Sequence, residues 1–176
     1  ISRERANANK IFGRFLAECM DEVGFSIASV RGGEKDNAIA KQCDALLVVP
    51  EEKTASFEDA VQTFETMLKK EHHFTDPQMH IYVEKECCGE TEVLTGEIAQ
   101  KLMFLLSHLP NGVQKRIPEV PDSVQTSLNM GILAQTEDEI SMIFSVRSSV
   151  TSEKEWLMKQ MQHLTESVDG YCRISG

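Results

Sequence analysis

Four stretches of the chain repeat apolar residues at intervals of three and four positions, the spacing that gives a helix one apolar face. The helices predicted in this way cover residues 8–24, 56–72, 95–109 and 152–170. Thr95 and Ser152 stand where a side-chain oxygen can cap the first turn, and Gly24 and Gly170 stand where a helix commonly ends.

Shorter apolar or alternating segments between these helices predict strands. They lie at residues 25–31, 43–49, 79–84, 125–135 and 139–149, with a short last strand at 171–174. The run at 43–49 is continuously apolar and is ended by Pro50, which predicts a buried strand. Leu109-Pro110-Asn111-Gly112 predicts a stop and a turn after the third helix.

The order of these elements is helix-strand-strand-helix-strand, read twice, with pseudo-halves at about 1–90 and 91–176. One further strand before residue 1 would turn the first half into a ferredoxin-like plait. No residue-level repeat relates the halves, so the doubling is architectural. The predicted fold class is α+β, a two-layer sandwich of this plait type, doubled as two αββαβ halves.

The two long strands predict a hairpin with one apolar and one polar face. A loop at 136–138 would place Ser127 opposite Arg147 and Asn129 opposite Ser145. The apolar face would then carry Leu128, Met130, Ile132 and Ala134 beside Ile140, Met142, Phe144 and Val146. The other face would show a polar cluster around a single arginine.

Composition narrows the classes of function. The 176 residues are 41% apolar and 26% charged, as in globular proteins, and the net charge is −10. A surface this acidic repels phosphate backbones and anionic lipids, so we expect neither nucleic acid nor membrane as a partner. The longest strongly apolar stretch, residues 45–49, is far shorter than the ~20 residues of a membrane span.

The five cysteines are an odd number and two of them are adjacent, which favours a reducing compartment over a disulfide framework. Residues 1–10 lack the apolar core of a signal peptide, so we expect a cytoplasmic location. The chain starts without methionine and directly with a helix, which suggests a piece excised from a larger protein.

The sequence contains no His-Glu-x-x-His motif, no His-x-Asp pair and no phosphate-binding loop. His72, His73, Asp76 and His80 could crowd a metal ion, or could be solvated residues at a helix end. Cys87 and Cys88 lack the spacing of a metal-binding pair and fit an exposed strand end or partly buried thiols. We therefore expect no metal site and no catalysis from this chain alone.

Two residues are candidates for ligand recognition. Arg147 is either an arginine on a solvated sheet face or a clamp for a carboxylate, because a guanidinium offers two parallel donors to a planar anion. Asn37 either supports a left-handed loop after Gly32-Gly33 or donates its amide to a developing oxyanion. Met103 and Phe104 lie off the apolar stripe of their helix and modestly favour a dimer.

Five strings occur in a specific order along nearly the whole chain. They are the segment from Arg5 to Leu16, Arg31-Gly32-Gly33 followed by Asn37-Ala38-Ile39, Leu109 to Val113, Thr126 to Gly131, and Arg147-Ser148-Ser149. Together they resemble the lid domain of the Xaa-His dipeptidases, the carnosinase-like aminoacyl-histidine enzymes of the di-zinc metallopeptidase group. The resemblance implies the fold of a bacterial exopeptidase dimerisation domain.

The resemblance also implies a parent enzyme whose separate catalytic domain holds two zinc ions and the general-base glutamate. Residues 1–176 would be the lid and dimerisation domain of a homodimer, inactive without the absent catalytic domain. By this resemblance, Arg147 matches the arginine that binds the carboxylate of the dipeptide substrate. Asn37 matches the lid asparagine that contacts substrate or oxyanion.

The chain departs from the family pattern at two positions. Ala40 replaces the usual proline after Asn-Ala-Ile, and Gln125 replaces a common acidic residue. The roles of Thr126, Ser127 and Asn129 stay open. The alternative function is a free-standing α+β module that binds a ligand, or a purely structural dimerisation module.

Overall fold

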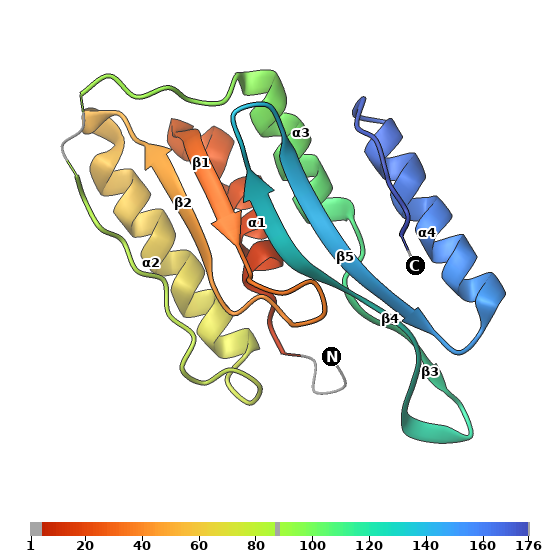
Figure 1. Cartoon of the computed structure of the whole chain (residues 1–176). Helices are drawn as coiled ribbons and strands as arrows, with labels where there is room; N and C mark the ends of the chain where they lie inside the picture. The colour runs from red at the N-terminus through yellow and green to blue at the C-terminus, as the bar shows by residue number, and fades with distance from the viewer. Residues whose placement is uncertain (1–4, 87–88, 176) are drawn as a thin grey trace.

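The computed structural model describes residues 5–86 and 89–175 and combines helices with one antiparallel sheet (Figure 1). The helices are α1 (Ala8–Cys19), α2 (Thr54–Glu71), α3 (Gly96–His108) and α4 (Thr151–Glu166). The strands are β1 (Ser26–Gly32), β2 (Cys43–Val48), β3 (Gly112–Ile117), β4 (Val120–Gln135) and β5 (Ile140–Ser148). A π-helical turn, Met20–Gly24, extends α1, and a 3-10 turn, Glu51–Lys53, precedes α2. No described helix is long and apolar enough to cross a bilayer.

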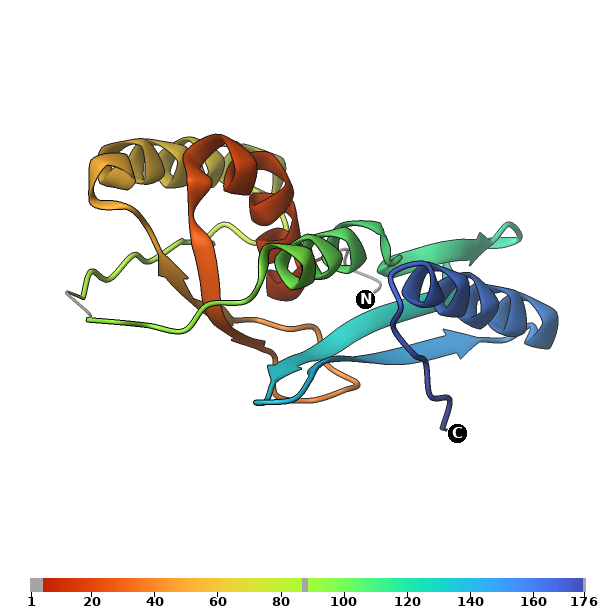
Figure 2. The same ribbon diagram turned by 90° about the horizontal axis from the view of Figure 1, so that it is seen from above.

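The long strand β4 organises the sheet, because it pairs with three other strands. β5 runs along one edge of β4, while β3 and then β1 share the opposite edge, and β2 continues the sheet beyond β1. The helices lie along one side of this sheet, as Figure 2 shows. The α+β class and the two-layer arrangement are therefore confirmed.

Four phenylalanines form the centre of the larger core. Phe15 of α1 contacts the rings of Phe25, Phe57 and Phe64, with centroid distances of 5.6, 6.1 and 5.3 Å. All four are buried, and they join α1, the start of β1 and α2. A smaller core lies under α4, where Leu157 and Met161 pack with Leu128.

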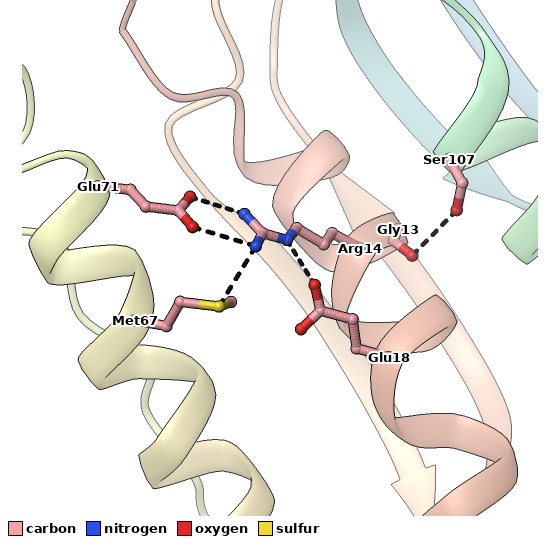
Figure 3. A network of polar contacts seen from close by, with 6 residues as sticks. All are labelled: Gly13, Arg14, Glu18, Met67, Glu71 and Ser107. Atoms are coloured by element: carbon pink, nitrogen blue, oxygen red, sulfur yellow. Dashed lines mark hydrogen bonds and ion pairs between the residues drawn. The ribbon is translucent and has the colours of Figure 1, made fainter.

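Polar contacts fasten α1 to both neighbouring helices (Figure 3). The guanidinium of Arg14 donates two hydrogen bonds to Glu71 of α2, at 2.7 and 3.1 Å, and one to Glu18 at 2.6 Å. These carboxylates raise the pKa of Arg14. On the other side, a Cβ added to Gly13 would lie 2.4 Å from the Cβ of Leu106, so only glycine permits this approach of α1 and α3.

Several predicted elements differ in the structure. The run predicted as a buried strand forms the edge strand β2 instead: Leu46 is 44% exposed, because among the described residues β2 pairs with β1 alone and has helices on one side. Residues 79–84 are extended but join no strand, and residues 171–174 form none either. β3, which the sequence did not predict, adds a strand instead.

The doubled order is also wrong for the described residues. After α2 the elements run α3-β3-β4-β5-α4, so neither half ends with the predicted fifth element, a strand. Thr95 caps α3 as expected, by accepting the N–H of Ile98. Ser152 does not cap α4, which begins one residue earlier and has no side-chain cap. Met103 and Phe104 are half-buried, and Met103 packs against the larger core.

Glu65 of α2 anchors the extended segment that follows the helix. Its carboxylate accepts the N–H of Ile81 at 3.1 Å, pairs with Lys69 at 2.9 Å and contacts His80. Burial opposes ionisation of this carboxylate, but these three partners outweigh burial and lower the pKa of Glu65 from 4.5 to about 2. A carboxyl group whose pKa is lower in the folded protein stabilises it above pH 4.5, and this contribution disappears as the pH falls toward 2.

We expect Glu65→Gln to lower the free energy of unfolding by up to about 1 kcal/mol near neutral pH, because a half-solvated ion pair contributes little more. The difference in the free energy of unfolding between the variant and the unmodified chain should disappear as the pH falls from about 4.5 to about 2. Urea denaturation across this pH range measures it, with Glu58→Gln, at an exposed pair with Lys85, as the control. A gap that stays constant down to the lowest pH would show that the Glu65 carboxylate does not carry the effect.

Candidate functional site

A broad cavity of about 2430 Å³ extends from the loop after β1 to the end of β5. Asn37 and Arg147 both line it, although they lie far apart in the sequence. Ser127, Asn129 and Ser145 line it as well, so the polar face that the hairpin pattern predicted contributes part of the wall. The structure thus brings the two candidate recognition residues to one concave surface.

Arg147 lies near the end of β5, opposite Ser127, and Asn129 lies opposite Ser145, so the predicted register is confirmed at both pairs. The side chain of Arg147 is exposed. Within residues 5–86 and 89–175, its guanidinium has no hydrogen-bonding or acidic partner. A planar anion such as a carboxylate can therefore accept two parallel hydrogen bonds from it without displacing another group.

The predicted pairing of β4 with β5 is correct because of a bulge that the sequence pattern did not predict. Gln135 pairs with Ile140, so the loop is one residue longer than predicted, and a bulge between Met130 and Ile132 compensates for this shift. The bulge also changes which side chains face the helices. Leu133, 1% exposed, occupies the core in place of the predicted Ile132.

The loop that carries Asn37 packs directly against Gly131, the glycine at the bulge of β4. A Cβ on Gly131 would lie 2.3 Å from the carbonyl oxygen of Asp36 and 2.4 Å from that of Lys35. Gly33 starts the loop with φ of +71°, and a Cβ there would lie 1.8 Å from the carbonyl oxygen of Gly131. Asn37 itself is exposed on this loop.

Buried carboxamides connect this loop to the rest of the fold. Asn129 is 2% exposed and donates its Nδ2 to the carbonyl oxygen of Ala38 at 2.7 Å. Its Oδ1 accepts from Nδ2 of Asn7, which is 4% exposed and caps α1. These roles of Asn7 and Asn129 were not predicted from the sequence. The signal available was that Asn7 directly precedes the predicted helix, where asparagine is a favoured cap.

The remaining residues of interest have structural partners. Ala40 is buried, and its carbonyl oxygen accepts the N–H of Ala8 at 2.9 Å, so the loop stays joined to α1 without the family's proline. Thr126 shares a hydrogen bond of 2.9 Å with Ser148 at the end of the hairpin. Cys43 lines the cavity, but burial raises the pKa of its thiol to about 12, which keeps it protonated and a poor nucleophile.

Within the part of the chain that the structure describes, no three His, Cys, Asp or Glu side chains are grouped to hold a metal ion. His80 contacts Glu65, His73 bonds the carbonyl oxygen of Lys70, and Asp76 accepts the N–H of Ala6. Cys87 and Cys88 lie outside the described residues. The described side chains do not fit a zinc site, so no chemical step is assigned to a metal here.

Comparison with known proteins extends these observations. Residues 3–76 match the family model of the peptidase dimerisation domain. The chain is 26% identical, over 158 residues, to the cytosol non-specific dipeptidase of Escherichia coli (strain K12), covering 90% of this chain and 32% of that protein. It also resembles the crystal structure of aminoacylhistidine dipeptidase from Vibrio alginolyticus, with a TM-score of 0.94 and 26% identity over 98% of this chain and 35% of that one.

The chain thus spans about a third of the length of each relative. The family match covers α1 to the end of α2, and the structural match adds the β3–β5 sheet and α4. The predicted resemblance to the lid and dimerisation domain of the Xaa-His dipeptidases is therefore confirmed: residues 3–76 match the model of the peptidase dimerisation domain, and the chain as a whole is similar to part of two dipeptidases.

Proposed function

We propose that this chain is the lid and dimerisation domain of a cytoplasmic, metal-dependent dipeptidase that releases histidine from Xaa-His dipeptides. The observation that carries the proposal is the cavity wall shared by Asn37 and Arg147. Both residues matched family positions in the sequence, and both present exposed polar side chains to the same concave surface. The relative named for aminoacylhistidine cleavage and the one named for the cytosol support the substrate and the location.

In this proposal Arg147 holds the free carboxylate of the dipeptide. It shares the cavity wall with Ser127, Ser145 and Ser148, whose small side chains leave access to both donors of the fork. The arginine would fix the position of the C-terminal histidine relative to the scissile bond. A carboxylate held at this position favours substrates in which the C-terminal carboxylate lies one residue after the scissile bond, as in a dipeptide, over longer peptides, in which it lies further away.

Asn37 would act on the peptide carbonyl. A side-chain amide can donate to the oxygen that becomes negative in the tetrahedral intermediate, and this interaction strengthens as the reaction proceeds. The loop geometry set by Gly33 and Gly131 holds Asn37 at the cavity. The two zinc ions of this proposal would be held by residues outside this chain, where they would supply Lewis acidity.

Dimerisation is supported by two features of the sheet and α4. The outer edge of β5 pairs with no strand among the described residues, and an unpaired edge can accept a strand from a second copy. Trp156 of α4 is 57% exposed, and tryptophan is enriched at protein interfaces. We propose a homodimer.

The test uses the full-length protein. We expect it to sediment as a dimer and to cleave Xaa-His dipeptides with a kcat/KM at least about tenfold above that for the matching Xaa-Ala dipeptides. Inactivity with every dipeptide after zinc loading would contradict the proposal. Equal kcat/KM values for the Xaa-His and Xaa-Ala dipeptides would support a dipeptidase but contradict the proposed specificity for histidine.

A further inference from the structure

A gap in the sheet lies next to the Asn37 loop. β3 pairs with β4 as far as Leu128, and β1 joins the same edge at Leu133. Between these two contacts, Met130 has no partner strand on this edge among the described residues. Two carboxamides take the place of the strand: Asn111 accepts the N–H of Met130 at 2.8 Å, and Asn7 donates to its carbonyl oxygen at 2.8 Å.

The orientation of Asn7 fixes the orientation of Asn129. The Oδ1 of Asn7 accepts the N–H groups of Asn9 and Lys10 at the start of α1, so its Nδ2 must face β4. That Nδ2 donates to Oδ1 of Asn129 at 3.2 Å. The amide of Asn129 is thereby turned so that its own Nδ2, the donor, faces the loop and meets the carbonyl oxygen of Ala38.

We propose that Asn129 is a positioning residue that fixes Asn37 for substrate contact through its hydrogen bond to Ala38. The inference rests on the proposed function of Asn37. Asn7, which caps α1, would thus set the orientation of the Asn129 amide. That amide in turn holds the loop that carries Asn37, through its hydrogen bond to Ala38. Asn129 touches neither the substrate nor the reacting atoms; it acts through the loop.

The contacts of the loop support a specific role over general packing. Among the described residues, the backbone N–H of Ala38 bonds within the loop, to the carbonyl oxygen of Lys35 at 3.3 Å, and the next backbone hydrogen bond from the loop to the rest of the fold is at Ala40. Among the described residues, the Asn129 amide is the side chain that holds the backbone next to Asn37. A buried amide also needs its partners, because burial without a hydrogen bond is unfavourable. Loss of the bond would therefore free the loop while the two cores stay intact.

The experiment uses the full-length protein with five variants. Asn129→Ala removes the donor, and Asn129→Asp keeps the size and an acceptor for Asn7 but offers Ala38 no donor when ionised. Asn111→Ala is the matched control, because it removes a carboxamide bond to the adjacent Met130 without touching the loop. Asn37→Ala alone and the double variant Asn37→Ala/Asn129→Ala together test whether the two residues act together.

Two readouts separate positioning from stability. Amide hydrogen exchange in residues 35–40 should accelerate about fivefold or more in both Asn129 variants, the factor expected from one lost hydrogen bond, and should not change in Asn111→Ala. In dipeptide hydrolysis, Asn129→Asp should lower kcat between about tenfold and about a hundredfold with KM nearly unchanged. The double variant Asn37→Ala/Asn129→Ala should then have almost the same kcat as Asn37→Ala alone.

Unchanged exchange in the Asn129 variants would overturn the proposal, as would kinetic losses that multiply in the double variant. Exchange that accelerates equally in Asn111→Ala would assign the effect to general loosening of β4 and would also overturn it. If the full-length protein cleaves no dipeptide, the proposed function fails. The exchange measurement then still decides whether Asn129 holds the loop.

Discussion

Replacing Phe15 by alanine is expected to lower the free energy of unfolding by about 3–5 kcal/mol, the range for removing a large aromatic side chain from a core. Phe15 is 7% exposed and contacts three aromatic rings, so the change removes apolar burial and leaves a cavity where α1, β1 and α2 meet. A loss of this size is close to the whole free energy of unfolding of a domain at the lower end of the usual range, about 5 kcal/mol. Urea denaturation of the chain, with and without Phe15→Ala, measures it.

Phe74→Ala is the matched control, because Phe74 is 88% exposed and its ring contacts only His73 among the described aromatic side chains. Its effect should stay within about 0.5 kcal/mol, as for other surface substitutions. A loss below about 1 kcal/mol at Phe15 would contradict this description of the core. It would mean that the helices are held to the sheet mainly by contacts other than the aromatic cluster.

If the full-length protein is the dipeptidase that we propose, Arg147→Ala is expected to lower its kcat/KM for dipeptides by about 10-fold to about 150-fold. This range corresponds to one hydrogen bond to a charged group, worth about 1.5–3 kcal/mol. Arg147→Lys should recover only part of the loss, because lysine keeps the charge but lacks the planar fork. Steady-state kinetics with a single Xaa-His dipeptide measures all three enzymes.

Arg31→Ala provides the comparison for Arg147. Arg31 is also an exposed arginine on a strand, but it pairs with Asp44 at 3.5 Å and does not line the cavity. Its replacement should change kcat/KM by less than about twofold. If both variants lose activity equally, the loss reflects general surface charge, and Arg147 has no specific contact with the substrate.

The sequence predicted the helices well because each carries an apolar stripe of the right period. It placed the strand β2 correctly but failed at its burial, at residues 79–84 and at β3, because these features depend on neighbouring elements. The apolar run of β2 lies at a sheet edge, so coverage by tertiary partners decides its exposure. Residues 79–84 alternate like a strand but bond to the side chain of Glu65. The short β3 follows a turn and has no strong pattern of its own.

The candidate site was predictable in part. The alternation of apolar and polar residues in β4 and β5, with an assumed loop at 136–138, predicted Arg147 opposite Ser127, but this pair forms only because a bulge between Met130 and Ile132 compensates for a longer loop. The family strings single out Asn37. The buried carboxamides were not predictable, because Asn7 and Asn129 are 122 positions apart and asparagine ordinarily faces solvent. The role of Gly131 was equally hidden, since only the fold brings the Asn37 loop onto it.

The most direct test of the central claim is the ratio of kcat/KM between a Xaa-His dipeptide and its C-terminal amide, measured for the full-length enzyme and for Arg147→Ala. We expect the enzyme to prefer the free acid by about tenfold or more, and this preference to fall close to one in the variant. A ratio that is the same in both enzymes would contradict the claim, because the carboxylate would then be bound by a group other than Arg147.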